Sequence, residues 1–305
     1  MSKKGLAAAL ITLGWLCAGG GASAQTRAEL REEFHQTYEL RGDGRVSLQN
    51  TTGVIRIEAW ERDEVKVDAV KRAHTPEALA GATIKVEASR QVIRVGTKYS
   101  SATNTWNFDG ERRYENPASV DYNLKVPRGA RLDTVELVNG SLEIDGLAGY
   151  VEASSVNGPV RAAGLTGEVR LATVNGRLEA DFGQARGRLP VTLTSVNGPI
   201  VLTLPPDAGA ELSAGTIHGR IRNDFARPAS SARRVGREYT GTLGSGGPTI
   251  RLNNVNGDIE IRAARGGRAS EPLDASDPPR GLTSVPATQG RGATAVKPTT
   301  RGIVT

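Results

Sequence analysis

A Val-Asn-Gly triplet recurs along the chain, and the spacing of its copies constrains the fold more than any other feature. The first three copies are 18 residues apart and the fourth follows after 22, the five copies beginning at Val138, Val156, Val174, Val196 and Val255. In the first two repeats, apolar residues alternate with polar ones on both sides of a Gly-Leu-x-Gly segment, and the alternation continues in the later ones. Alternation with period two, interrupted by glycines, predicts two short strands in each repeat.

Two arrangements of these strands satisfy the alternation. Asn-Gly between alternating apolar residues is typical of a two-residue hairpin, which would give an antiparallel meander or sandwich. However, Pro159 and Pro199 follow the glycine at two copies and have no N–H to donate across such a turn. An 18-residue coil has a perimeter of roughly 60 Å, enough for two facing strands. We therefore predict an all-β chain that forms a β-solenoid, a β-helix-like stack of two-strand repeats of 18–22 residues, with the antiparallel sandwich or meander as the alternative.

Side-chain columns favour the solenoid. The same position of successive repeats holds Glu143, Arg161 and Glu179, which would lie about 4.8 Å apart in stacked parallel strands. Alternating charge suits such a column because like charges directly opposite are unfavourable. A degenerate triplet at Ile217 and an earlier one at Thr51 extend the same frame.

Each triplet is interpreted as a structural corner. Glycine supplies the positive φ of a tight turn, and stacked asparagines can form a ladder of amide hydrogen bonds. The calcium-binding β-roll pattern of glycines and aspartates is missing. The predicted turn residues are Asn139, Gly140, Asn157, Gly158, Asn175, Gly176, Asn197, Gly198, Gly219, Asn256 and Gly257.

Outside the triplets the pattern is still mostly β. Residues 25–137 contain further alternating strands and one short helix, with Thr75 as its cap, Pro76 in its first turn and Gly81 at its end. Residues 138–264 hold the repeats, interrupted by a polar excursion at 223–248. Residues 265–305 are rich in Gly, Pro, Ala, Ser and Thr, and we predict a disordered tail.

The first 24 residues are typical of a secretory signal peptide. Two lysines precede a short apolar run, and Ala22-Ser23-Ala24 supplies a cleavage site before Gln25. We therefore expect export to the periplasm, the extracellular space or the cell surface, with no transmembrane segment in the mature chain. Cleavage would remove Cys17, which is the only cysteine, so no disulfide or thiolate chemistry is expected.

The charge of the chain argues against a nucleic-acid partner. The formal net charge of +6 arises at the two ends, because removing residues 1–24 and 265–305 leaves 31 Lys and Arg against 30 Asp and Glu. A nearly neutral folded region has no basic field to bind phosphates.

Candidate chemistry is sparse. No phosphate loop, dinucleotide fingerprint, nucleophile elbow or metal-ligand spacing is present, so we assign no catalytic residue, metal or cofactor. Two carboxylate pairs have the separation of glycosidase acids, Glu143 with Asp145 and Glu179 with Asp181. Solvated strand charges are the commoner explanation of such pairs.

The aromatic segment at residues 96–119 is the best candidate for ligand recognition. It sets four aromatic side chains among Asn, Asp and Arg, a combination that suits sugar rings or protein interfaces. A loop that covers the end of the solenoid is the alternative. The possible ligand contacts are Tyr99, Trp106, Phe108 and Tyr114.

Several motifs resemble a known family. YNLKVPRGA at 122–130 leads into the triplets, LPPDAGA follows at 204–210, and NTTGVIRIEAWERDEVKVDAVK occupies 50–71. These resemble the bacterial "putative adhesin" family of domains of unknown function with β-strand repeats. The resemblance covers nearly all of residues 40–264 and implies a β-helix-like domain that is exported or faces the cell envelope, and it supplies no catalytic residue. We place the bounds of the adhesin-like β-repeat domain at 25–264.

We therefore expect an exported, non-enzymatic β-repeat protein that acts as an adhesin-like or scaffolding module. The partner is unknown, with an envelope glycan or a surface protein as the candidates. A carbohydrate-active enzyme on a β-helical scaffold is the first alternative, and an envelope-stress regulatory partner of a membrane protein is the second.

Overall fold

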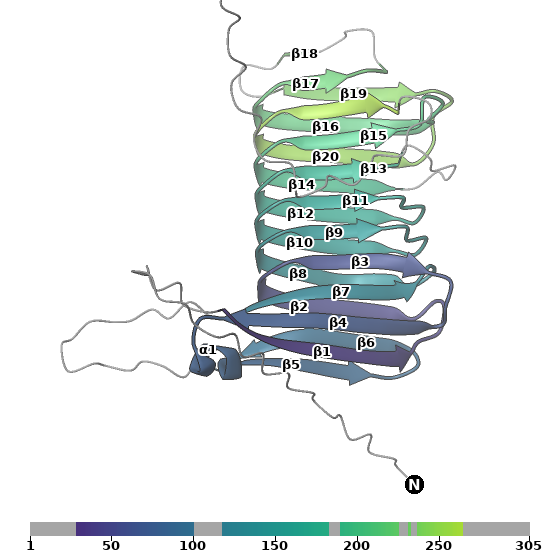
Figure 1. The fold of residues 1–305 in the computed structure, drawn as a ribbon. Coiled ribbons are helices and arrows are strands. Elements are labelled where there is room, and N and C mark those ends of the chain that lie inside the picture. Colours follow the sequence, from purple (N-terminus) through teal and green to yellow (C-terminus); the bar gives the residue numbers. More distant parts are fainter. Residues whose placement is uncertain (1–28, 101–117, 183–189, 226–230, 233–236, 265–305) are drawn as a thin grey trace, which may run out of the picture. The chain divides into compact units, whose positions relative to one another are not determined.

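The computed structural model describes residues 29–100, 118–182, 190–225, 231–232 and 237–264. These residues form two β-sheets and one short helix (Figure 1). Sheet A has ten strands in the order β1 (Leu30–Glu39), β4 (Glu64–Ala73), β7 (Ser119–Pro127), β3 (Ile55–Trp60), β9 (Leu142–Asp145), β11 (Val160–Ala163), β13 (Leu178–Asp181), β15 (Ile200–Leu204), β21 (Ile259–Ala263) and β17 (Ile221–Asn223).

Sheet B has eleven strands and faces sheet A across the core. Its order is β18 (Ser231–Ala232), β19 (Arg237–Leu243), β16 (Ala210–His218), β20 (Thr249–Asn256), β14 (Val191–Asn197), β12 (Val169–Asn175), β10 (Val151–Asn157), β8 (Arg131–Asn139), β2 (Arg45–Thr52), β6 (Val92–Tyr99) and β5 (Ala82–Ala88).

The repeats stack as parallel strands, so the solenoid prediction is confirmed and the antiparallel alternative is wrong for them. Val151 of β10 pairs with Val169 of β12, and Val160 of β11 pairs with Leu178 of β13. Each sheet thus receives one strand from every coil. Antiparallel pairs occur only near the two ends of the described stack, at β1–β4–β7, β5–β6 and β16–β19–β18.

Alternation places small aliphatic side chains between the sheets. In β12, for example, Val169, Leu171 and Thr173 are buried while Arg170 and Ala172 face outward. The interior columns consist mostly of Val, Leu, Ile and Ala, which fit the narrow space between two sheets. Removing this apolar surface from water is the main source of stability for such a stack.

The last coil is out of chain order. Strands β20 and β21 lie between the coil of β14 and β15 and the coil of β16 and β17. The chain therefore builds the coil of the degenerate triplet before the coil beneath it. The described part of the 223–248 excursion includes β19, which pairs antiparallel with β16 and extends sheet B.

At the other end of the stack, β1, β4, β5 and a short helix form what we call the N-terminal cap. The predicted helix is present as α1 (Pro76–Gly81), and the Thr75 hydroxyl accepts a hydrogen bond from the Ala78 N–H at 3.1 Å. Near it, the buried Lys71 donates to the Ala82 carbonyl at 3.1 Å and pairs with Glu32 at 2.8 Å. The predicted signal peptide and tail lie outside the described residues.

Candidate functional site

The triplet asparagines form one continuous amide ladder along an edge of the stack. Each Nδ2 donates to the Oδ1 of the preceding rung, at 2.9 Å for Asn157 to Asn139 and 2.8 Å for Asn175 to Asn157. The series continues through Asn197 and Asn256. At its end the His218 Nδ1 lies 3.1 Å from the Asn256 Oδ1. Since that oxygen can only accept, Nδ1 carries the proton.

The triplet glycines are required by close backbone contacts. Gly158 has φ of 140°, and a Cβ placed on it would lie 1.7 Å from the Gly140 carbonyl oxygen. Gly176 and Gly198 have the same constraint against the corner below them. A Cβ placed on Gly219 would lie 2.0 Å from the Gly257 carbonyl oxygen. This geometry is that of a structural corner.

A buried polar column supports the corners from inside. The residue two positions before each asparagine is small and polar in most repeats, and the Thr216 hydroxyl donates to the Gly257 carbonyl at 3.0 Å. The Asn254 amide donates to the Gly198 carbonyl at 2.9 Å. This column was not predicted from the sequence, although its residues share one position of the repeat: Ser155, Thr173, Ser195, Asn254 and Thr216.

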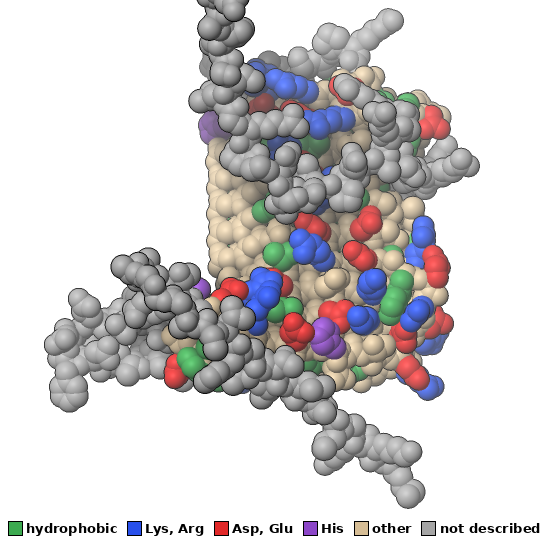
Figure 2. Space-filling view, viewed as in Figure 1, with side chains coloured by type: hydrophobic (Ala, Val, Ile, Leu, Met, Phe, Trp, Pro, Cys, Tyr) green, Lys and Arg blue, Asp and Glu red, His purple; other side chains and the backbone are tan. Residues whose placement is uncertain are grey.

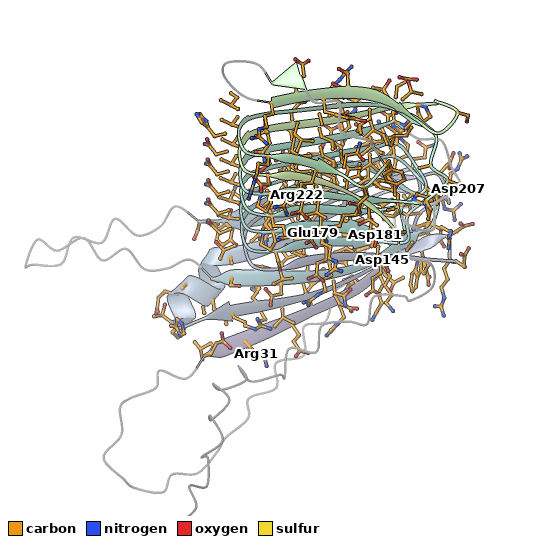
Figure 3. All side chains as sticks on the ribbon, turned by 90° about the horizontal axis from the view of Figure 1, so that it is seen from above. Arg31, Asp145, Glu179, Asp181, Asp207 and Arg222 are labelled. Atoms are coloured by element: carbon orange, nitrogen blue, oxygen red, sulfur yellow. The ribbon has the colours of Figure 1, made fainter. Side chains whose placement is uncertain are left out.

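The first residue of each triplet points to solvent and forms what we call the corner ridge. Its side chains run beside the amide ladder in the spatial order Val138, Val156, Val174, Val196, Val255 and Ile217. The side chains along this edge stand in a regular row in Figure 3.

The outer face of sheet B carries a shallow groove, which we call the sheet-B groove. Short side chains from β8, β10, β12 and β14 leave space on this face, and longer charged side chains border it. The outward side chains that line the groove are Thr134, Glu136, Glu152, Ser154, Arg170, Ala172, Thr192 and Thr194.

The three charged side chains of the groove are each held by a neighbour. Glu136 accepts a hydrogen bond from the Gln49 amide at 3.0 Å. Glu152 accepts one from the Tyr150 hydroxyl at 2.6 Å, and partial burial together with this carboxylate raises the pKa of Tyr150 to about 12. Arg170 donates to Glu168 at 3.0 Å, and its guanidinium lies 5.8 Å from the Tyr150 ring centre. The groove therefore has positioned donors and acceptors.

The two carboxylate pairs lie on the outer face of sheet A, as Figure 3 shows for Asp145, Glu179 and Asp181. Glu143 accepts a hydrogen bond from the Arg56 Nε at 3.0 Å, and Glu179 accepts one from Arg177 at 2.9 Å. Arg161 stands between Glu143 and Glu179, as the charge column predicts. One carboxylate of each pair is therefore held in a partly exposed ion pair.

Tyr99 is directed toward a polar network of the N-terminal cap. Its hydroxyl lies 3.4 Å from the Asn50 Oδ1, which also accepts a hydrogen bond from Thr97 at 3.0 Å. Burial raises the pKa of Tyr99. The other three aromatic residues of the predicted ligand segment, Trp106, Phe108 and Tyr114, lie outside the described residues.

The described residues contain neither a candidate metal site nor a membrane-spanning helix. In these ranges, no group of three or more His, Cys, Asp or Glu side chains could hold a metal ion. The helix within the same ranges is not long and apolar enough to cross a membrane.

Comparison with known proteins identifies the repeat region. Residues 116–262 match the family described as Toastrack DUF4097. This segment is similar to Toastrack domains. It runs from before β7 to residue 262, one residue short of the end of β21, so the coil of β2 and β3 precedes the matched range although it stacks directly on the matched strands. The resemblance at residues 50–71 also lies before the match.

Three solved structures are similar to this chain. A "putative cell adhesion protein" from Clostridium sporogenes is 13% identical with a TM-score of 0.44, covering 77% of this chain and 100% of its own. A "putative adhesin" from Bacteroides fragilis is 12% identical with a TM-score of 0.38, covering 76% and 97%. A "putative lipid binding protein" from Parabacteroides distasonis is 8% identical with a TM-score of 0.25, covering 75% and 96%. No curated protein matches the sequence significantly.

Proposed function

We propose that this protein is an exported, non-enzymatic recognition module of the cell envelope that binds a glycan in the sheet-B groove. The observation that carries the proposal is the support of Glu136, Glu152 and Arg170 by the neighbouring side chains Gln49, Tyr150 and Glu168. Charged side chains fixed in this way lose little freedom on binding, which favours recognition of a polar ligand.

The floor of the groove has the chemistry that sugar hydroxyls need. Ser154, Thr192 and Thr194 each offer a hydroxyl that can donate or accept, and they stand on a rigid sheet. Carboxylates and a guanidinium at the border can each bind two hydroxyls of a sugar ring. One arginine and two carboxylates make the lining mixed in charge, so a neutral or weakly charged glycan suits it better than a polyanion.

The leader predicted at residues 1–24 supports export, which would bring the groove to glycans of the envelope. The nearly neutral folded region is consistent with such a partner, since a nucleic acid requires a basic surface.

Two alanine positions allow a matched test. Ala172 lies in the groove on β12, and Ala163 faces outward on β11, the preceding strand of the chain, on the opposite sheet. Both are partly exposed, so arginine can be introduced at either position without entering the core. We expect Ala172→Arg to block the groove and Ala163→Arg to leave it open.

The measurement is retention of the purified protein on cell-wall glycan and on a glycan array. We expect the wild type and Ala163→Arg to be retained equally and Ala172→Arg to lose at least tenfold in affinity. Equal retention of all three proteins would exclude the groove. The enzyme alternative would be favoured instead if the wild type cleaved a polysaccharide and Ala163→Arg did not. The reason is that Ala163 lies between Asp145 and Asp181.

A further inference from the structure

The corner ridge holds all the exposed large hydrophobic side chains of the described residues. Val138, Val156, Val174, Val255 and Ile217 are between 36% and 46% exposed, and all five begin a triplet. Single exposed aliphatic residues are common on protein surfaces, but a continuous row of them marks a contact surface. Because neighbouring rungs are about 4.8 Å apart, the six rungs extend over about 24 Å.

The ridge and the ladder beside it carry no fixed charge. Their rungs consist of Val or Ile followed by Asn or His. Figure 2 shows the polar row at the left edge of the stack free of Lys, Arg, Asp and Glu side chains between its two ends; the ridge valines, which would be green, are not seen in this view. Charged columns occupy the face beside it, such as the one that contains Arg56, Glu143 and Arg161. A partner of strong charge would therefore gain nothing at this edge.

The ladder leaves hydrogen-bonding capacity on every rung. An asparagine amide has two N–H donors and an oxygen with two lone pairs, and the ladder uses one donor and one lone pair of each inner residue. The exposed edge thus offers one spare donor and one spare acceptor at each step. Such a surface is complementary to itself.

We propose that the corner ridge is a homotypic contact surface, on which a second copy of this chain binds. A second copy has the same step along its edge, so rungs of the two ridges stay matched over the whole contact. In an antiparallel arrangement about a twofold axis, valines interdigitate and the spare amide groups pair, as in dry zipper interfaces. Val174 and Val196 lie at the middle of the ridge, next to this axis.

The size of the ridge sets the strength of the contact. Six rungs contribute about a dozen side chains, whereas a standard stable interface uses roughly 20–30 residues on each side. The association is therefore weak between free molecules and becomes effective where copies are concentrated, as on a surface. This inference is independent of the glycan proposal, since the ridge and the sheet-B groove involve different side chains.

Sedimentation equilibrium of the full-length protein over a wide concentration range tests the proposal. We expect the average mass of the wild type to rise toward that of a dimer, and the double variant Val156→Lys/Val174→Lys to associate at least tenfold more weakly. The control places the same charges at the opposite corner of the same coils, as Ala148→Lys/Thr166→Lys, and should associate like the wild type. A wild type that stays monomeric at every concentration, or ridge lysines without effect, would overturn the proposal.

Cysteine cross-linking tests the geometry. In a chain carrying Cys17→Ser, Val174→Cys should form a disulfide-linked dimer on mild oxidation, and Ala148→Cys should not. Cross-linking of both variants to the same extent would overturn the assignment. It would also be overturned if the ridge lysines abolished retention on neutral glycan while all proteins remained monomeric, because the ridge would then bind glycan.

Discussion

Replacing Gly158 by alanine should destabilise the stack strongly. Gly158 has φ of 140°, a region that costs a non-glycine residue about 1–3 kcal/mol. The new Cβ would also lie 1.7 Å from the oxygen and 2.7 Å from the carbon of the Gly140 carbonyl, which are backbone atoms of the next corner. The two corners must therefore move apart.

Moving the corners apart weakens two hydrogen bonds. These are the bond from the Gly140 N–H to the Asn157 carbonyl and the amide bond from Asn157 to Asn139, both 2.9 Å long. Each contributes about 0.5–1.5 kcal/mol, so the expected loss in the free energy of unfolding is about 2–6 kcal/mol in total. That is a large part of the roughly 5–15 kcal/mol by which domains are stable.

Gly215 provides the matched control, because a Cβ on it would meet nothing within 4 Å. Gly215→Ala should change the free energy of unfolding by less than about 1 kcal/mol, in the stabilising direction. Urea unfolding followed by circular dichroism measures both variants. A loss below about 1 kcal/mol in Gly158→Ala would refute the view that close backbone contact dictates the glycine.

Three further predictions concern stability. Asn157→Ala removes two ladder bonds of 2.9 and 2.8 Å and should cost about 1–2 kcal/mol in urea unfolding, and no loss would mean that the ladder is not stabilising. Thr75→Ala removes the cap of α1 and should cost about 0.5–2 kcal/mol, whereas Thr75→Ser should restore most of it. Burial raises the pKa of Tyr122 from 10.0 to about 12, so its contribution is complete below pH 10 and is lost as pH rises to about 12. The loss is roughly 2–3 kcal/mol, and a wild type and Tyr122→Phe with the same pH dependence would contradict it.

The spacing of the repeats was sufficient to predict the coil, because the prolines after the triplets and the charged positions agree with it. Pro159 and Pro199 exclude hairpins at two corners, and the charge column at Glu143, Arg161 and Glu179 fits parallel strands. Strand alternation then determines which side chains enter the core. One outward position of the repeat also indicated the groove, because it holds the short side chains of Ser154, Ala172 and Thr194 in three neighbouring strands.

The order of the last two coils could not be read from the frame, because both triplets fit the same position. Strand β16 precedes β20 in the chain but lies beyond it in the stack. Only the degenerate Ile217-His218-Gly219 corner offers a hint, since terminal repeats are often atypical. The support of Glu136 by Gln49 was equally hidden, because these residues are 87 positions apart in the chain.

The most direct test of glycan recognition is a map of the binding site by NMR. Backbone amide signals of the protein would be followed while soluble cell-wall glycan fragments are added. We expect the largest shifts at Ser154, Ala172 and Thr194, in the sheet-B groove. Shifts centred on Ala163 and its neighbouring carboxylates, or no shifts at saturating glycan, would contradict it.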